Sequence, residues 1–137
     1  MRYSAIVPTY NRRNFVSDAI DSLLQQTRPP SQTVVVDDGS TDGTATLLRD
    51  RYGSRIDLVE QVNQGEPAAV NAGLRQAKHD VVTVLVSDDW LDPIWAERVL
   101  PTLDNELDVV AAYGNYRIVG QDGRIVTIID NGPYDQR

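Results

Sequence analysis

The chain has 137 residues, of which 41% are apolar and 24% are charged, a length and composition that suit one compact globular domain. The formal net charge of -7 argues against non-specific binding to nucleic acid, and the lack of cysteine excludes disulfides and thiolate metal sites. No apolar run is long enough to span a bilayer and the N-terminus lacks a hydrophobic signal core, so we expect a cytoplasmic, soluble or membrane-peripheral protein.

The chain begins with a short apolar segment that predicts a strand over 3–8. A polar connector follows, in which Asn14 is expected to cap a helix beginning at Phe15. Apolar residues recur there at helical spacing, which indicates one buried face. The helix is expected to end before the RPP segment, because proline cannot continue it.

Three consecutive valines run into two aspartates and predict a second strand over 33–38. The GSTDGT loop follows, and Ser40 or Thr41 is expected to cap a helix over 44–52. A third strand with partial alternation is predicted over 56–61.

The next segments continue the alternation of helix and strand. A helix is predicted over 67–78, with a proline in its first turn where the missing N–H costs nothing. The run VVTVLV predicts a fourth strand over 81–86. Asp92 and the proline after it are expected to begin a helix that ends near Leu103.

The last part of the chain predicts a fifth strand over 107–119, a GQDGR turn and a hairpin partner over 125–130. Together these elements predict an α/β fold, with a mainly parallel sheet flanked by helices and a C-terminal β-hairpin. We expect one domain over 1–137, and we expect it to be truncated at the C-terminus because no closing helix follows the hairpin.

An aspartate pair, Asp88 and Asp89, follows the most apolar strand, where parallel sheets bind ligands. Adjacent carboxylates repel each other, and a divalent cation with oxygen preference, Mg²⁺ or Mn²⁺, would relieve that repulsion. Alternatively, one aspartate caps the next turn and the other is solvated.

A second pair, Asp37 and Asp38, follows the valine strand. We interpret Asp37 as a brace for the loop after it. Asp38 is expected to contact a ligand, because a carboxylate at this place can hold a ribose or a base. The opposing interpretation is that the pair has no ligand, so that Asp37 braces the loop while the GSTDG segment merely turns the chain.

Two further segments end at the same predicted edge. Tyr10 in VPTYN is able to stack on a base, although the segment also fits a plain connector in which Asn11 holds the turn. In NQGEP, Gly65 permits close approach of a ligand to the backbone, or it simply opens a helix with Pro67. His79, the only histidine of the chain, is interpreted as structural or solvated.

Four segments together resemble the family 2 glycosyltransferases of the GT-A fold. They are IVPTYNRRNFVSDAIDSLLQQT, VVVDDGSTDGT, NQGEPAAVNAGL and VLVSDDWLDP, and they occur in the order and at the spacing of that family. The resemblance covers residues 3–117. It implies sugar transfer from a nucleotide-diphosphate sugar to an acceptor hydroxyl, with inversion at the anomeric carbon and help from Mn²⁺ or Mg²⁺.

The resemblance also implies a role for each matching residue. Pro8 and Tyr10 would border the nucleobase, and Asp38 would hydrogen-bond to it. Asp88 would contact the ribose or help to hold the metal, and Asp89 would bind the metal that bridges the diphosphate. A UDP-sugar is the expected donor, with dTDP- and GDP-sugars as alternatives.

The chain departs from the family pattern at two positions and leaves the catalytic base unknown. Val86 stands where the metal motif often has an aspartate, and Val70 stands where many members have arginine. No residue matches the family's base, for which Asp130 and Asp135 are candidates only by default. The chain is therefore also compatible with a non-catalytic module that binds nucleotide sugars.

Two other families are disfavoured. A receiver-type signalling domain needs a lysine downstream of its acceptor aspartate, but Lys78, the only lysine, precedes Asp89. A nucleotidyltransferase would have a glycine-rich entry loop, which VPTYNRRN is not.

For the glycosyltransferase that the resemblance implies, the acceptor is expected to be a polysaccharide, a lipid carrier or a protein glycan. The sequence does not indicate the oligomeric state.

Overall fold

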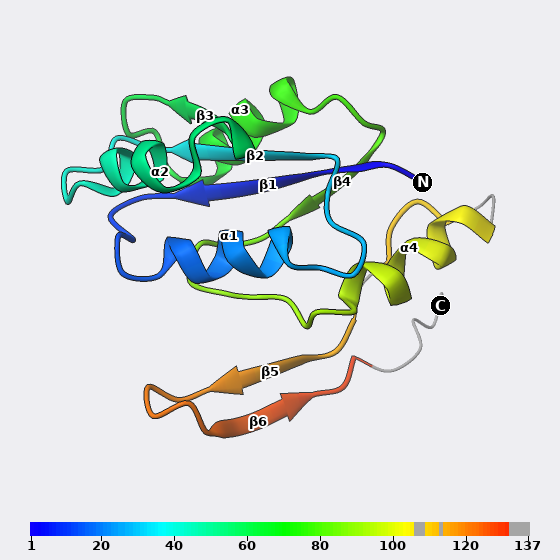
Figure 1. Ribbon diagram of the computed structural model, residues 1–137. Coiled ribbons are helices and arrows are strands. Elements are labelled where there is room, and N and C mark those ends of the chain that lie inside the picture. The colour runs from blue at the N-terminus through cyan, green and yellow to red at the C-terminus, as the bar shows by residue number, and fades with distance from the viewer. Residues whose placement is uncertain (106–108, 113, 132–137) are drawn as a thin grey trace. The chain divides into compact units, whose positions relative to one another are not determined.

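The computed structural model describes residues 1–105, 109–112 and 114–131 (Figure 1). They fall into two compact units, one over residues 1–97 and one from Arg98 onward. No helix in the described ranges has the length and apolar character that a bilayer crossing requires.

The first unit is built on a parallel sheet whose strands lie in the order β3-β2-β1-β4. The strands are β1 (Tyr3–Thr9), β2 (Gln32–Asp37), β3 (Asp57–Glu60) and β4 (Val81–Val84). Both central strands, β1 and β2, are buried along their whole length, as expected for strands covered on two faces. Because β1 pairs in parallel with both β2 and β4, their carboxyl ends meet at one edge.

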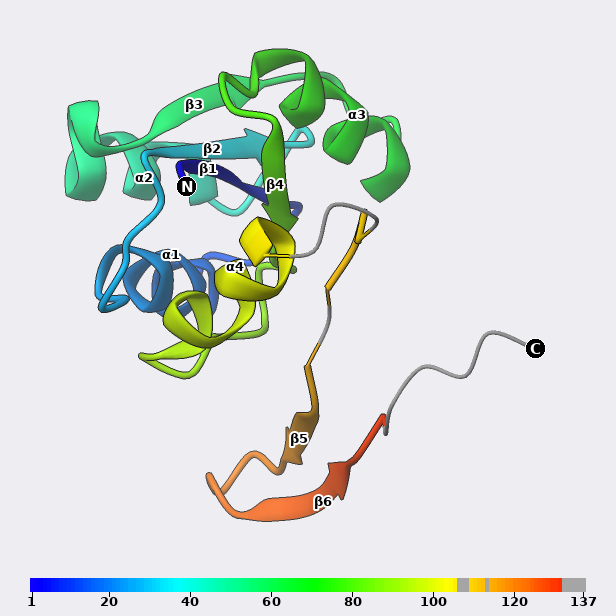
Figure 2. The same cartoon turned by 90° about the vertical axis from the view of Figure 1, so that its right-hand side faces the viewer.

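Three helices cover the sheet, namely α1 (Val16–Leu24), α2 (Thr44–Tyr52) and α3 (Glu66–Gln76), and a 3-10 turn, η1 (Gly53–Arg55), follows α2. In Figure 2 the central strands run between α1 and α3. Alternation along β2 explains this arrangement, since successive side chains of a strand point to opposite faces. Val35 packs in one core cluster with residues of α1 and α2, whereas Val34 and Val36 pack against α3. The predicted flanking of the sheet by helices is confirmed.

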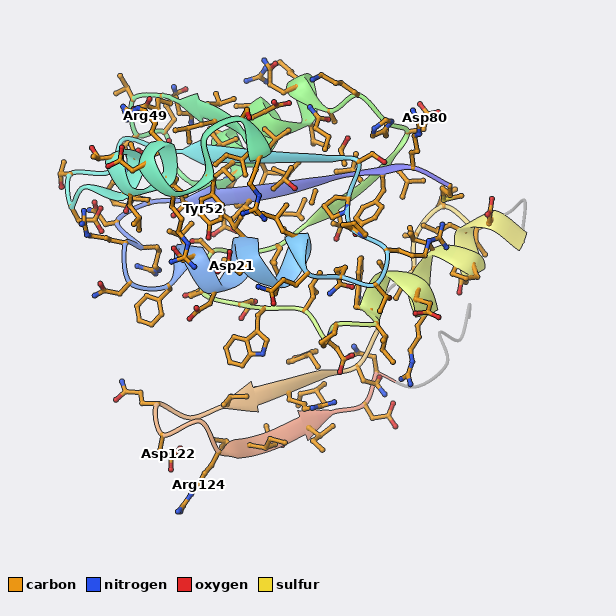
Figure 3. All side chains as sticks on the ribbon, viewed as in Figure 1. Asp21, Arg49, Tyr52, Asp80, Asp122 and Arg124 are labelled. Atoms are coloured by element: carbon orange, nitrogen blue, oxygen red, sulfur yellow. The ribbon has the colours of Figure 1, made fainter. Side chains whose placement is uncertain are left out.

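Helices α1 and α2 are tied together by a tyrosine. The Tyr52 hydroxyl donates to the Ser17 carbonyl oxygen at 3.1 Å or to Asp21 Oδ1 at 2.9 Å, and Tyr52 and Asp21 point toward one another in Figure 3. Burial raises the pKa of Tyr52, so its hydroxyl remains a donor at neutral pH. This contact fixes the two helices that follow the first two strands.

Helix α3 approaches β1 closely at Gly73. A Cβ at this position would lie 2.4 Å from Ile6 Cγ2, and Ile6 is fully buried in the centre of β1. We predict that Gly73→Ala lowers the free energy of unfolding by roughly 1–3 kcal/mol, because the added methyl group overpacks the core. Denaturant unfolding measures this, with Gly114→Ala as the control, because apart from its chain neighbours no described residue lies within 4 Å of a Cβ placed there. Equal stability of the two variants would contradict the packing described.

Helix α4 (Trp95–Asn105) begins in the first unit, where Gln26 holds its start. The Gln26 side chain donates to the Asp92 carbonyl oxygen at 2.7 Å and accepts from the Ala96 N–H at 3.0 Å. The second unit also contains the antiparallel strands β5 (Tyr116–Val119) and β6 (Ile125–Ile129), which confirm the predicted hairpin.

Two predicted helix caps are wrong. Helix α1 begins at Val16 with Phe15 at the N-cap position, and Asn14 makes no cap. Helix α2 has Gly43 at its N-cap position, and neither Ser40 nor Thr41 caps it. The physical reason is that Asp42 accepts the Thr44 N–H at 3.0 Å, while Ser40 and Thr41 bond to another loop.

The predicted fifth strand over 107–119 is too long. Strand β5 covers only Tyr116–Val119, and residues 109–112 form no strand, while residues 107, 108 and 113 lie outside the described residues. The strand is short because its partner is β6 alone, and the pairing begins where Tyr116 meets Ile129. Strand β4 is likewise shorter than predicted, because its pairing with β1 ends at Val84.

Candidate functional site

A cavity of about 460 Å³ opens in the first unit, at the carboxyl edge of the sheet. It is bordered by the end of β1 and the connector after it, the residue after β2, the start of α3 and the segment after β4. The lining residues are Pro8, Thr9, Tyr10, Arg12, Asp38, Asn63, Gly65, Glu66, Ala69, Val86, Ser87 and Asp88. A site at this edge is where open parallel sheets bind ligands.

The structure brings together most of the residues singled out from the sequence. Pro8, Tyr10, Asp38 and Asp88 all line the cavity, although they come from three separate segments. Asp89 is exposed and follows Asp88 directly, but it is not among the lining residues.

The candidates named for a catalytic base are not placed in the cavity. Asp130 belongs to the second unit, and Asp135 lies outside the described residues. His79, interpreted from the sequence as structural or solvated, does not line the cavity either.

Asp38 is held firmly, because its carboxylate anchors the loop between β3 and α3. Oδ1 accepts the Gln61 side-chain amide at 2.7 Å and the Gln64 N–H at 2.9 Å, and Oδ2 accepts the Gly65 N–H at 2.8 Å. Burial alone would raise the pKa of Asp38, but these hydrogen bonds outweigh it and hold the pKa below its usual value. Asp38 is therefore ionised at neutral pH and shapes one wall of the cavity.

The neighbouring glycine brings two loops into backbone contact. Gly39 has φ +78°, and a Cβ on it would lie 2.9 Å from the Asn63 nitrogen and 3.2 Å from the Gln61 carbonyl oxygen. Glycine is the residue that tolerates both this conformation and this approach. Together with Asp38, it fixes the β3–α3 loop against the loop that follows β2.

Asp37 does what the sequence analysis expected. Its side chain is buried, and Oδ1 accepts both the hydroxyl and the backbone N–H of Ser40. The interpretation of Asp37 as a brace of the loop after β2 is confirmed.

In the acidic pair after β4, the carboxylates of Asp88 and Asp89 repel each other, as expected for adjacent aspartates. Although the residue is largely exposed, partial burial of its carboxyl group, and then the neighbouring charge of Asp88, raise the pKa of Asp89. Arg12 Nε lies 3.5 Å from Asp88 Oδ2 and offsets part of the negative charge, with both side chains about half exposed. The pair thus presents oxygen ligands that are incompletely neutralised by protein groups.

A divalent cation fits this pair only with help from a ligand. Among the described residues, no group of three or more His, Cys, Asp or Glu side chains could hold a metal ion. Two carboxylates that share a cation with phosphate oxygens are nevertheless a common way to bind Mg²⁺. The donor chemistry therefore fits a cation that arrives with a phosphorylated substrate.

Sequence reasoning missed Thr9, the last residue of β1. Thr9 is 3% exposed and belongs to the cavity lining, and its Oγ1 has no hydrogen-bond partner among the described residues. Buried hydroxyls are normally paired, so an unpaired one in a residue of the cavity lining needs an explanation, and a ligand that reaches it would supply the missing partner. The segment VPTYN had indicated the place, but only the packing of neighbouring strands decides that this hydroxyl stays unpaired.

Comparison with known proteins places this site in context. The family model described as Glycosyl transferase family 2 matches residues 4–135. An uncharacterized glycosyltransferase of Nostoc sp. is 35% identical over 97% of the chain, which spans only 42% of that protein's length.

Solved structures give the same assignment. TarS of S. aureus, solved in complex with UDP, is 32% identical with a TM-score of 0.66, over 76% of this chain and 32% of that one. A mannosyltransferase of Pyrobaculum calidifontis, solved with GDP-Man and Mn²⁺, is 32% identical with a TM-score of 0.61, over 65% of this chain and 28% of that one. These matches confirm the resemblance carried by the four sequence motifs and the GT-A fold class.

Proposed function

The chain belongs to glycosyl transferase family 2, and on this premise we propose that it is the donor-binding domain of an inverting glycosyltransferase. The donor is a nucleotide-diphosphate sugar, with UDP as the expected nucleotide. The cavity supports this proposal, because it combines an aromatic side chain, an ionised carboxylate and an arginine at one sheet edge. TarS of S. aureus, 34% identical with a TM-score of 0.59 in that comparison, has been solved in complex with UDP-GlcNAc. A cavity of about 460 Å³ lies in the size range of small-molecule sites.

Within this proposal the residues singled out by the family resemblance keep their roles. Pro8 and Tyr10 border the base, Asp38 accepts a hydrogen bond from it, and Asp88 faces the ribose or the metal. Asp88 and Asp89 hold Mn²⁺ or Mg²⁺, which when bound neutralises the diphosphate leaving group. Arg12 adds positive charge on the same side. The base that deprotonates the acceptor hydroxyl is not assigned to any residue of this chain.

The observation that carries the proposal is the cavity that brings Tyr10, Asp38 and Asp88 together, and Thr9 adds to its lining a residue whose buried hydroxyl is unpaired among the described residues. We predict that Thr9→Val lowers the affinity for the nucleotide about 5–10-fold, the worth of one hydrogen bond. The same change should leave stability equal or raise it by about 1 kcal/mol, because it removes an unpaired polar group. Calorimetry and thermal unfolding measure the two effects. Loss of stability with unchanged affinity would show that Thr9 serves the fold.

Calorimetric titration tests the function itself. UDP, GDP and dTDP are titrated into the chain with and without Mn²⁺. We expect UDP to bind more tightly than the other two, and Mn²⁺ to strengthen its binding. No heat from any nucleotide would contradict a donor site in this chain. Hydrolysis of UDP-sugars in the same samples distinguishes a domain that turns the donor over from a module that only binds it.

A further inference from the structure

The connector between β1 and α1 alternates between two neighbours. Tyr10 and Arg12 line the cavity, whereas Asn11 and Arg13 bond to the loop that follows β2. That loop, residues 40–43, is not part of the cavity lining. The connector therefore has one side at the cavity and one side that is hydrogen-bonded to the loop after β2.

Asn11 is hydrogen-bonded to this loop through both its side chain and its backbone. Its Oδ1 accepts the Thr41 N–H at 2.8 Å, and its own N–H donates to Ser40 Oγ at 2.9 Å. Its backbone has φ +51°, and among the described residues it is the only one besides glycines with positive φ. Most side chains would make this conformation cost about 1–2 kcal/mol, whereas asparagine tolerates it better.

The hydrogen bonds of Asn11 connect it to a buried residue at the end of β2. Ser40 donates its hydroxyl to Asp37, whose side chain is buried at the end of β2. The hydrogen bonds thus run from Asp37 through Ser40 to Asn11, and from there to Thr41. Asp37 is followed by Asp38, and Asn11 stands between Tyr10 and Arg12. All three of these neighbours line the cavity.

Arg13 adds a second attachment to the same loop. Its N–H donates to Asp42 Oδ2 at 3.1 Å, and its guanidinium donates to the Gly43 carbonyl oxygen at 3.1 Å. Arg12 is therefore flanked on both sides by fastened residues. A long side chain on a fixed backbone retains less freedom, so its contact with a ligand costs less conformational entropy.

We propose that Asn11 is a positioning residue that holds Arg12 over the cavity, where the guanidinium meets the diphosphate of the nucleotide. The inference rests on the proposed function, since it takes the ligand to be a nucleoside diphosphate. In the structure Arg12 is paired with Asp88 by a contact of 3.5 Å between half-exposed side chains. Such a pair is weak, so a diphosphate can compete for Arg12.

A double-mutant cycle on UDP affinity tests the inference. Asn11→Ala should weaken UDP binding about 10-fold, the worth of one charge-assisted hydrogen bond. In the background of Arg12→Gln the same change should cost less than about 3-fold, because coupled residues are not additive. Asn11→Asp, which keeps the Oδ1 acceptor and tolerates the backbone, should stay within about 3-fold of the unchanged protein.

Two further variants serve as a replacement for Asn11→Ala and as a control for the loss of an arginine. Asn11→Gly keeps the backbone conformation but lacks the acceptor, so it replaces Asn11→Ala if that variant fails to fold. Arg49→Gln removes an exposed arginine paired with Glu60 at 3.0 Å, and it should bind UDP as the unchanged protein does. Melting temperatures of all variants identify any that unfold at the titration temperature.

The outcomes separate this inference from the proposed function. If the unchanged protein binds no nucleotide, the donor site itself is wrong. If it binds UDP but Asn11→Ala and Asn11→Gly bind equally well, Asn11 only serves the fold. If their full loss persists in the Arg12→Gln background, Asn11 does not act through Arg12, and the inference is overturned.

Discussion

Asp38→Asn is expected to weaken both the fold and the binding of the nucleotide. The carboxylate accepts three hydrogen bonds from the β3–α3 loop, two on Oδ1 and one on Oδ2. An amide would turn an N–H₂ group toward a backbone N–H and leave a buried donor unpaired, at a cost of roughly 1–3 kcal/mol. Because the loop and its anchor both line the cavity, UDP affinity should fall about 10–100-fold.

Denaturant unfolding and calorimetry measure these two effects in the same protein samples. Asp50→Asn is the matched control, because Asp50 is an exposed aspartate of α2 that does not line the cavity. The control should match the unchanged protein in both measurements. An Asp38→Asn variant with unchanged stability would contradict the anchoring of the loop, and unchanged UDP affinity would contradict the placement of the nucleotide.

Asp89→Ala is expected to abolish the effect of Mn²⁺ on UDP binding. With one of only two carboxylates removed, the cation loses a ligand that the diphosphate cannot replace. The Mn²⁺-dependent part of the affinity should fall by at least about 10–100-fold, the loss seen when even supporting groups of a metal site are removed. UDP binding without Mn²⁺ should change little, and calorimetry at several Mn²⁺ concentrations measures both quantities.

Asp80→Ala provides the control for this experiment. Asp80, labelled in Figure 3, precedes β4. Asp88 and Asp89 follow β4 in the chain, so the two ends of one strand are compared. Its removal takes away the same charge at the opposite edge of the sheet. If both variants lowered the Mn²⁺ effect equally, the metal would respond to net charge and not to a site at the acidic pair.

Most of the first unit could be predicted from sequence because its central strands contain apolar runs. A run such as the three valines of β2 is buried on both faces, and this burial requires helices on either side. The helix caps could not be predicted in the same way. Asn14, Ser40 and Thr41 are all good capping residues, but none of them caps a helix. Ser40 and Thr41 bond to Asn11 instead, and Asp42 accepts the Thr44 N–H at the start of α2.

The site was predictable to the extent that its residues stand at strand ends. Asp38 and Asp88 follow apolar runs, and the parallel sheet brings those ends together. Other features depend on contacts between distant segments. The partners of Asp38 lie 23 to 27 residues away along the chain, and the unpaired state of Thr9 depends on what packs around it.

The most direct test of the donor site is the position of the metal and nucleotide in a crystal. Crystals of the chain grown with UDP and Mn²⁺ would be measured at a wavelength where manganese scatters anomalously. We expect an anomalous peak at Asp88 and Asp89, with the base between Tyr10 and Asp38 and within hydrogen-bond distance of Thr9. A nucleotide bound elsewhere, with the peak away from the acidic pair, would contradict the assignment of this cavity as the donor site.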